Sequence, residues 1–197
     1  MVLGKAIFLD KDGTLIPNKP YCIDPRQAQL DLNTVRALRL FSKLGYQLFI
    51  ISNQSGIARG YFSEEEVDLV FQRFGELFQS LELHLQGFYY CPHLADDFCQ
   101  CRKPKPGMLL QAATEHGIDL KQSWFIGDIL HDVEAGKRAG CRTVLLDNGG
   151  ETEWELSRDR LPDHIVSSLL DAAKVIAVLH DDQILEQNGI DPTGINR

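Results

Sequence analysis

Polar residues follow directly on three short apolar runs of the sequence. Asp10 follows the run AIFL, Ser52 follows LFII, and Asp128 follows WFIG. If these runs are parallel strands, their carboxyl ends meet at one edge of a sheet, where open α/β sheets bind ligands. Any one of these residues could simply end a strand. Three together bring two carboxylates and a hydroxyl to one edge and indicate an active site.

The segment Asp10–Thr14 (DKDGT) places two carboxylates two residues apart. An EF-hand calcium loop opens with the same spacing, but it needs a further oxygen ligand at the next alternate position and a glutamate at the twelfth. Thr14 and Tyr21 stand in those places, which argues against a calcium loop. One carboxylate can instead attack phosphorus, while the other gives a proton to the leaving oxygen and later serves as a base. Asp10 and Asp12 therefore suit phosphomonoester hydrolysis.

A second cluster combines three cysteines with one histidine: Cys91 and His93, then, after five residues, Cys99 and Cys101. One imidazole and three thiolates complete a tetrahedral zinc shell with no open position, so the predicted metal is structural. The alternative, a disulfide, is weaker because Cys99 and Cys101 are poorly placed to bridge each other. The cluster leads directly into Arg102 and Lys103, two cations that an acidic protein needs at a phosphate site. Cys22 and Cys141 are interpreted as packing residues.

Strands and helices alternate in the elements that would carry these residues. Apolar runs too short for helices, without two-residue alternation, predict strands buried on both faces. They lie at Ala6–Leu9, Leu48–Ile51, Phe88–Tyr90, Trp124–Ile126 and Val144–Leu146. Alternation of this kind implies right-handed βαβ units. The predicted fold class is α/β, a Rossmann-like doubly wound parallel sheet.

Helices are predicted between the strands. Val35, Leu38 and Phe41 recur at helical spacing before Gly45, and Ser63 with Glu66 forms a capping box. Pro106 and Gly117 bound a further helix, and a short one runs from about Asp132 to Ala139. We expect a single domain over residues 1–180 and a flexible tail over residues 181–197.

The overall composition restricts the partners and the compartment. The chain has 197 residues and a formal net charge of −8, which disfavours nucleic acid and anionic membrane as main partners. Its start lacks the apolar core of a signal peptide, and no apolar run approaches the length of a membrane span. Five cysteines, three of them crowded beside a histidine, favour the reducing cytoplasm.

With these motifs identified, the sequence resembles the haloacid dehalogenase-like phosphatases. Asp10–Thr14 matches their first motif, Ser52-Asn53 the second, Lys103 the third, and Gly127-Asp128 with Asp132 the fourth. The resemblance implies Asp10 as nucleophile, Asp12 as general acid and base, and Ser52 with Lys103 on the phosphoryl oxygens. It also implies Mg²⁺ held by Asp10, the Asp12 carbonyl and Asp128. Asp132 has two open interpretations, support of the metal through water or stabilisation of a helix N-terminus.

The cysteine cluster narrows this resemblance. Cys-Pro-His…Cys-x-Cys-Arg-Lys-Pro is similar to the branch of the heptose bisphosphate and histidinol-phosphate phosphatases, and Asn53–Gly60 with Pro106–Met108 is similar to the heptose enzymes. Two features depart from the heptose pattern. The gap between His93 and Cys99 is short, as in the histidinol enzymes, and Ile129 replaces a lysine that usually contacts substrate.

The resemblance also implies how the substrate is bound. No insertion is long enough for a cap domain, so loops Pro17–Gln29 and Gln54–Arg59 and the zinc cluster would enclose the substrate. The implied contacts are Asn18, Lys19, Tyr21, Asn53, Gln54, Ser55 and Arg102. We expect a monomer that hydrolyses a small phosphorylated sugar, with heptose 1,7-bisphosphate as the first candidate. Histidinol phosphate, a polynucleotide phosphate and a non-catalytic phosphosugar-binding role are the alternatives.

Overall fold

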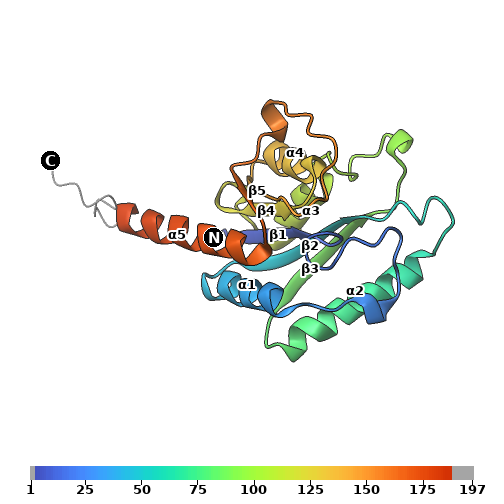
Figure 1. Cartoon of the computed structure of the whole chain (residues 1–197), viewed down its shortest axis with the longest axis horizontal. Coiled ribbons are helices and arrows are strands. Elements are labelled where there is room, and N and C mark those ends of the chain that lie inside the picture. Colours follow the sequence, from blue (N-terminus) through green and yellow to red (C-terminus); the bar gives the residue numbers. More distant parts are fainter. Residues whose placement is uncertain (1–2, 188–197) are drawn as a thin grey trace.

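Six parallel strands form one sheet in the computed structural model, which describes residues 3–187 (Figure 1). The strands are β1 (Ala6–Asp10), β2 (Gln47–Asn53), β3 (Leu85–Cys91), β4 (Trp124–Gly127), β5 (Arg142–Leu146) and β6 (His164–Val166). Their order is β3-β2-β1-β4-β5-β6, and every neighbouring pair is parallel. This strand order is that of a Rossmann-like doubly wound sheet, so the predicted fold class is confirmed.

Helices cover both faces of this sheet. One face carries α1 (Leu32–Lys43), α2 (Glu64–Ser80) and α5 (Leu169–Gln187), and the other carries α3 (Gly107–His116) and α4 (Leu130–Ala139) (Figure 1). Four 3₁₀ turns complete the described elements: Pro25–Gln27, Ala95–Asp97, Leu120–Gln122 and Arg158–Arg160. The connections between strand and helix are loops, and no cap domain interrupts the residues that the structure describes.

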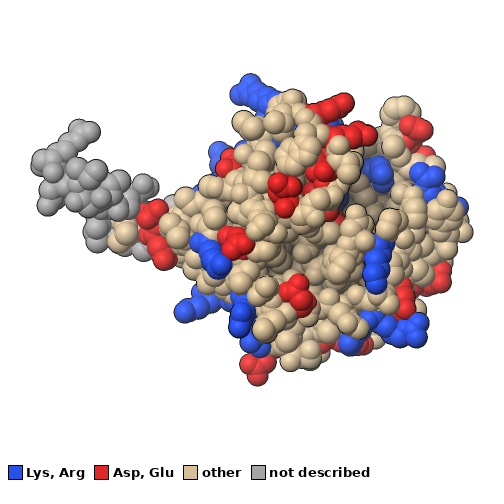
Figure 2. Space-filling view, viewed as in Figure 1, with Lys and Arg blue, Asp and Glu red and all other residues tan. Residues whose placement is uncertain are grey.

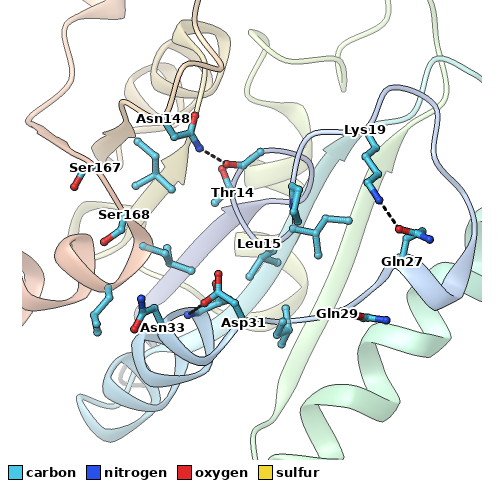
Figure 3. A pocket seen from close by; sticks show the side chains of 18 of the residues that line it. Thr14, Leu15, Lys19, Gln27, Gln29, Asp31, Asn33, Asn148, Ser167 and Ser168 are labelled. Carbon is cyan, nitrogen blue, oxygen red and sulfur yellow. Dashed lines mark hydrogen bonds between the residues drawn. The ribbon is translucent and has the colours of Figure 1, made fainter.

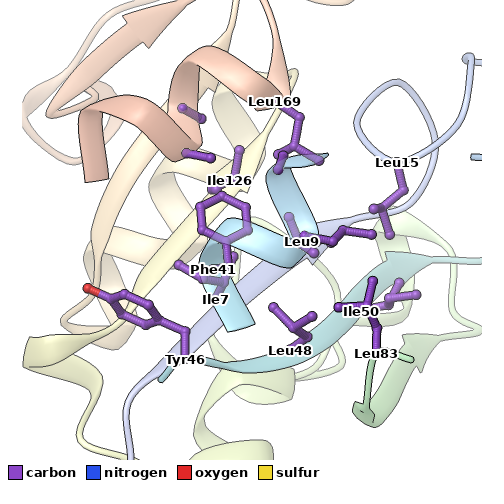
Figure 4. Packing of buried hydrophobic residues seen from close by; sticks show 14 of the residues in the cluster. Ile7, Leu9, Leu15, Phe41, Tyr46, Leu48, Ile50, Leu83, Ile126 and Leu169 are labelled. Atoms are coloured by element: carbon purple, nitrogen blue, oxygen red, sulfur yellow. The ribbon is translucent and has the colours of Figure 1, made fainter. Parts of the chain in front are cut away.

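The central strand β1 shows why the strands read as continuous apolar runs. Ile7 and Leu9 pack toward α1 and α5, whereas Ala6 and Phe8 pack toward α3 and α4. Successive side chains of a strand point to opposite faces, and both faces here are buried, so both sets must be apolar. Figure 4 shows the first of these two cores, in which Phe41 of α1 lies over the sheet.

Local signals at the helix ends agree with the predicted boundaries. Ser63 and Glu66 form the expected capping box at the start of α2, with Ser63 N donating to Glu66 Oε2 at 2.9 Å. α3 ends before Gly117, whose φ of 63° lies in the left-handed region that glycine adopts without steric cost. α4 starts at Leu130, two residues earlier than expected.

Two elements at the carboxyl end were not predicted. β6 is an edge strand of three residues, and Ile165 at its centre is 53% exposed, so it presents no apolar run to recognise. α5 did carry a recognisable signal, because Leu169, Ala172, Ala173 and Ile176 are buried at helical spacing. The segment expected to be a flexible tail begins inside this helix: residues 181–187 are helical, and residues 188–197 lie outside the described part.

The strand order also fixes where a ligand can bind. The chain winds outward in one direction from β1 and in the other from β4, so the switch between the two halves lies between these adjacent strands. Ligands of doubly wound proteins bind at the carboxyl ends of the strands at this switch. Asp10 ends β1 and Asp128 directly follows β4, so both carboxylates lie at that point.

Candidate active site

Four buried charged side chains meet at the switch point. Lys103 lies at their centre, and its Nζ donates to the carboxylate of Asp10 and lies 2.7 Å from Asp132 Oδ1. It also donates to the carbonyl of Ile51 at 3.3 Å. Asp128 completes the group, and all four residues are more than nine-tenths buried. The structure thus brings together the motif residues that the sequence places up to 122 positions apart.

Burial and mutual repulsion raise the pKa values of these carboxyl groups. Burial raises the pKa of Asp10 to about 6 despite the opposing effect of Lys103. Burial, with Asp10 and Asp132 beside it, raises the pKa of Asp128 to about 8. Burial alone would lower the pKa of Lys103, but Asp10 and Asp132 raise it above its usual value. Lys103 therefore stays charged, while the carboxyl groups compete for one cation.

The three carboxylates can hold a metal ion. One oxygen from each of Asp10, Asp128 and Asp132 lies within 4.8 Å of the other two. Asp128 Oδ2 is buried and has no hydrogen-bond partner among the described residues. When all three are ionised, three carboxylates against one lysine have a net charge of −2, which a divalent cation would neutralise. An all-oxygen donor set suits a hard cation such as Mg²⁺.

Asp12 lies beside this group but has a different partner. The buried Lys11 places its Nζ 2.8 Å from Asp12 Oδ1, a contact that the sequence did not indicate. Burial raises the pKa of Asp12 even though Lys11 opposes the shift. A raised pKa favours the protonated carboxyl, which is the form that a general acid needs.

Asn53, which ends β2, and Gln54, which follows it, orient two further groups. Gln54 Nε2 donates to Ser52 Oγ at 2.8 Å, which leaves the Ser52 hydroxyl hydrogen free to donate elsewhere. The Asn53 amide holds the backbone of Lys103 at both polar atoms. Lys103 N donates to Asn53 Oδ1 at 3.1 Å, and Asn53 Nδ2 donates to the Lys103 carbonyl at 3.2 Å. Asn53, expected to contact substrate, thus also positions Lys103.

A cavity of about 260 Å³ opens onto these groups. Six of the seven residues expected to contact substrate line it: Asn18, Lys19, Tyr21, Asn53, Gln54 and Ser55. Arg102 lies outside this lining, and its Nη1 donates to the His93 carbonyl at 3.1 Å. Ile129 lines the cavity, so an apolar side chain is present where the resemblance implies a lysine.

A larger cavity of about 520 Å³ lies behind the loop that follows β1 (Figure 3). It shares Lys19 and Cys22 with the smaller cavity, and its lining includes Thr14 and Asn148 but none of the four central charged groups. Lys19 Nζ donates to Gln27 Oε1 at 2.5 Å on its wall. The smaller cavity is therefore the candidate active site, because only it contains the chemistry.

The predicted cysteine and histidine cluster assembles beyond the end of β3. Cys101 Sγ lies 3.1 Å from Cys91 Sγ and 3.3 Å from His93 Nδ1, and Cys91 Sγ lies 3.6 Å from Cys99 Sγ. These sulfur separations are too long for disulfides, whose S–S bond is about 2.05 Å. They are close to the spacing of ligands around one tetrahedral metal ion. The four side chains could therefore hold a metal ion.

This cluster is tied to the active site through the backbone. The Cys91 carbonyl accepts a hydrogen bond from Gln54 N at 2.7 Å, and the His93 carbonyl accepts from Arg102. Lys105 Nζ donates to the carbonyl of Cys99. The position of Lys103, between Arg102 and Lys105, therefore depends on the geometry of the cluster.

On the face shown in Figure 2, acidic and basic side chains are interspersed around a central hollow. This mixture of charges differs from the continuous basic surface that binds a nucleic acid backbone.

No helix in the described range is both long enough and apolar enough to cross a membrane.

Comparison with known proteins adds independent matches. A family described as HAD-hydrolase-like matches residues 100–172. The chain is 39% identical over 180 residues to the D-glycero-beta-D-manno-heptose-1,7-bisphosphate 7-phosphatase of Pasteurella multocida, covering 88% of this chain and 97% of that protein. It is 39% identical over 154 residues to the D-glycero-alpha-D-manno-heptose-1,7-bisphosphate 7-phosphatase of Campylobacter jejuni, covering 78% and 88%. A D,D-heptose 1,7-bisphosphate phosphatase from B. bronchiseptica, solved with magnesium and phosphate, matches with a TM-score of 0.73 and 25% identity, covering 93% and 99%.

Proposed function

This chain belongs to the haloacid dehalogenase-like hydrolases, among the heptose bisphosphate phosphatases, and on that premise we propose that it removes the 7-phosphate from D-glycero-D-manno-heptose 1,7-bisphosphate. The observation that carries the proposal is the meeting of Asp10, Asp128 and Lys103 at the ends of β1 and β4. The relatives' names supply the sugar. Because those names differ in the anomer, both anomers belong in the test.

In the first step Asp10 attacks the phosphorus with a carboxylate oxygen. The bond between phosphorus and the sugar oxygen breaks, and protonated Asp12 gives its proton to that oxygen. Lys103 and the free hydroxyl hydrogen of Ser52 bind the phosphoryl oxygens, where negative charge must be stabilised. The raised pKa of Asp12 supports its role as the acid.

In the second step water replaces Asp10 on phosphorus. Asp12 is now a carboxylate and takes a proton from that water, whose oxygen attacks phosphorus as the bond to Asp10 breaks. Inorganic phosphate leaves, and both aspartates return to their starting states. A protein that only bound phosphosugars would need Lys103 and Ser52 but not Asp12, so the presence of Asp12 favours turnover.

Two metal ions complete the proposal. Mg²⁺, held by Asp10, Asp128 and the Asp12 carbonyl, supplies positive charge that reduces repulsion between a carboxylate and a phosphate. Asp132 is a third carboxylate within reach, although its ion pair with Lys103 gives it a second role. We assign zinc to the cluster of Cys91, His93, Cys99 and Cys101, because its four nitrogen and sulfur donors leave no position open.

Ile129 supports a second candidate substrate, histidinol phosphate. An apolar side chain on the cavity wall cannot pair with a second phosphate, whereas it can pack against an imidazole-bearing chain. Lys19 favours the bisphosphate, because it lines the same cavity and its ammonium group, which donates to Gln27 Oε1, could pair instead with the non-reacting phosphate. The proposed bisphosphate substrate therefore rests on the relatives' names, with Lys19 as the residue that would bind the second phosphate.

Phosphate release tests the two substrates directly. We expect kcat/KM for one anomer of heptose 1,7-bisphosphate to exceed that for histidinol phosphate at least ~100-fold, because a site built for polar groups rejects substrates that lack them. p-Nitrophenyl phosphate serves as the control for the phosphoryl chemistry. Preference for histidinol phosphate would overturn the sugar assignment, and no release from any ester would overturn the phosphatase itself.

The remaining parts of the proposal concern the cellular setting. A cluster of three thiolates requires reduced cysteines, which supports a cytoplasmic location. We propose a monomer, and size-exclusion chromatography with light scattering tests it. The net charge of −8 supports a small phosphosugar as the partner rather than nucleic acid or a membrane surface.

A further inference from the structure

The Asn148–Glu151 segment, which follows β5, packs against the Asp128 carboxylate, as does the loop that follows β1. At Gly150 an added Cβ would lie 2.1 Å from Asp128 Oδ2, and at Gly13 it would lie 1.9 Å from the same oxygen. No real side chain tolerates such contacts. Two glycines from separate segments therefore pack their backbones directly against Asp128.

The Asn148 amide links these two glycines. Its Nδ2 donates to the Gly13 carbonyl at 2.6 Å, the bond drawn from Asn148 in Figure 3, and its Oδ1 accepts from Gly150 N at 3.1 Å. Both polar atoms of one side chain are thus used to hold the two walls of the Asp128 site together. Asn148 itself is exposed, so this bridge lies at the rim of the site rather than in the core.

The same segment also holds the helix that carries Asp132. Glu151 Oε2 accepts a hydrogen bond from Leu130 N at 2.7 Å, which caps the first turn of α4. Glu151 Oε1 accepts from Glu153 N at 2.7 Å, so this side chain is fixed by a second bond. One short segment therefore contacts the surroundings of both Asp128 and Asp132.

We propose that Asn148 is a positioning residue for the metal-binding carboxylate Asp128. It fixes the distance between the Gly13 and Gly150 walls, and the walls allow the Asp128 carboxylate only a narrow range of orientations. Asp128 Oδ2 stays without a hydrogen-bond partner among the described residues and is available to a cation. The inference rests on the proposed Mg²⁺ site. It adds a residue that lies outside the four motifs.

Isothermal titration of Mg²⁺ into the full-length protein tests this role. Asn148→Ala should weaken Mg²⁺ binding about 3- to 10-fold, the range that corresponds to one net hydrogen bond. Gly150→Ala should weaken it by about 10-fold or more, because the new methyl must displace Asp128. Asn33→Ala is the matched control. Asn33 of α1 lines the larger cavity together with Asn148 (Figure 3), and among the described residues its side chain forms no hydrogen bond with Gly13 or Gly150.

A second readout separates positioning from general stability. The midpoint of thermal unfolding is measured for each variant with and without Mg²⁺. A merely structural role lowers both midpoints equally, whereas a positioning role reduces the increase that Mg²⁺ causes. Recovery of turnover by excess Mg²⁺ should accompany the loss in Asn148→Ala. Wild-type Mg²⁺ affinity in both Asn148→Ala and Gly150→Ala would overturn this inference alone. Failure of the wild-type protein to bind Mg²⁺ would overturn the proposed metal as well.

Discussion

Replacement of Asn53 by alanine separates positioning of Lys103 from contact with the substrate. The Asn53 amide makes two hydrogen bonds to the Lys103 backbone, at 3.1 and 3.2 Å. Each contributes about 1 kcal/mol net, so Asn53→Ala should lower the free energy of unfolding by about 2 kcal/mol. For a chain of this size the midpoint of thermal unfolding should then fall by about 4–8 °C.

The kinetic effect follows from the place of Lys103. Its Nζ contacts the Asp10 carboxylate inside the buried charge cluster, so a shift of its backbone misaligns the reacting groups. A misplacement of about 1 Å can cost ~10²-fold in rate, so we expect kcat to fall about 10- to 100-fold. The loss should be equal for heptose 1,7-bisphosphate and p-nitrophenyl phosphate, because both present the same phosphoryl group to Lys103.

Steady-state phosphate release on both substrates supplies the assay. Asn18→Ala is the contrasting variant, since Asn18 lines the cavity as an expected substrate contact and forms no hydrogen bond with Lys103 in the described part of the chain. It should raise KM for the heptose substrate and leave p-nitrophenyl phosphate largely unaffected. If Asn53→Ala behaves like Asn18→Ala, the amide serves the substrate and the positioning argument is refuted.

Three further predictions concern the reacting carboxylates and the two metals. Asp10→Asn should keep the fold but lose at least ~10³-fold in turnover. Asp12→Asn should slow the hydrolysis of alkyl phosphates more than that of p-nitrophenyl phosphate, because the p-nitrophenyl leaving group needs less protonation. Wild-type turnover in either purified variant contradicts the role of the replaced residue. The pKa of Asp128 is raised to about 8, whereas an aspartate in an unfolded chain has a pKa of about 3.9, so the metal-free protein should lose stability as pH rises between these values. The increase in the unfolding midpoint that Mg²⁺ causes should grow over the same pH range. An increase that does not change with pH contradicts this prediction. Mild chelation should stop turnover reversibly by removing Mg²⁺. Forced removal of zinc should also lower the midpoint of thermal unfolding. Elemental analysis that finds no zinc in the purified protein would reject the assignment of zinc to the Cys91–Cys101 cluster.

The sequence was sufficient to predict five of the six strands and the polar residues that meet at their carboxyl ends, because those signals are local. A run such as AIFL predicts a buried strand by itself, and the following Asp10 is placed by the strand end. The four cysteine and histidine ligands lie within eleven residues, so their spacing alone indicates a metal site. β6 was missed because a three-residue edge strand with an exposed centre carries no such pattern.

Long-range contacts were beyond this kind of reasoning. The bond between Asn53 and Lys103 joins residues fifty positions apart, and that between Asn148 and Gly13 joins residues 135 apart. No periodicity or spacing reports such pairs, since only the folded sheet brings them together. A shorter-range contact was also missed, because Arg102, expected to contact substrate, donates from its guanidinium to the carbonyl of His93, nine positions earlier.

The reacting residues lie at strand ends and the expected substrate contacts lie on a loop, and this separation has an evolutionary consequence. Asp10 ends β1, Ser52 is the penultimate residue of β2 and Asp128 directly follows β4, so the register of the sheet fixes all three. Asn18, Lys19 and Tyr21 instead lie on a loop outside the sheet. Substitutions and small insertions in such loops leave the strand pairing intact. A lineage could therefore exchange one phosphorylated substrate for another by changing this loop, while the residues that cleave the ester keep their positions in the sheet.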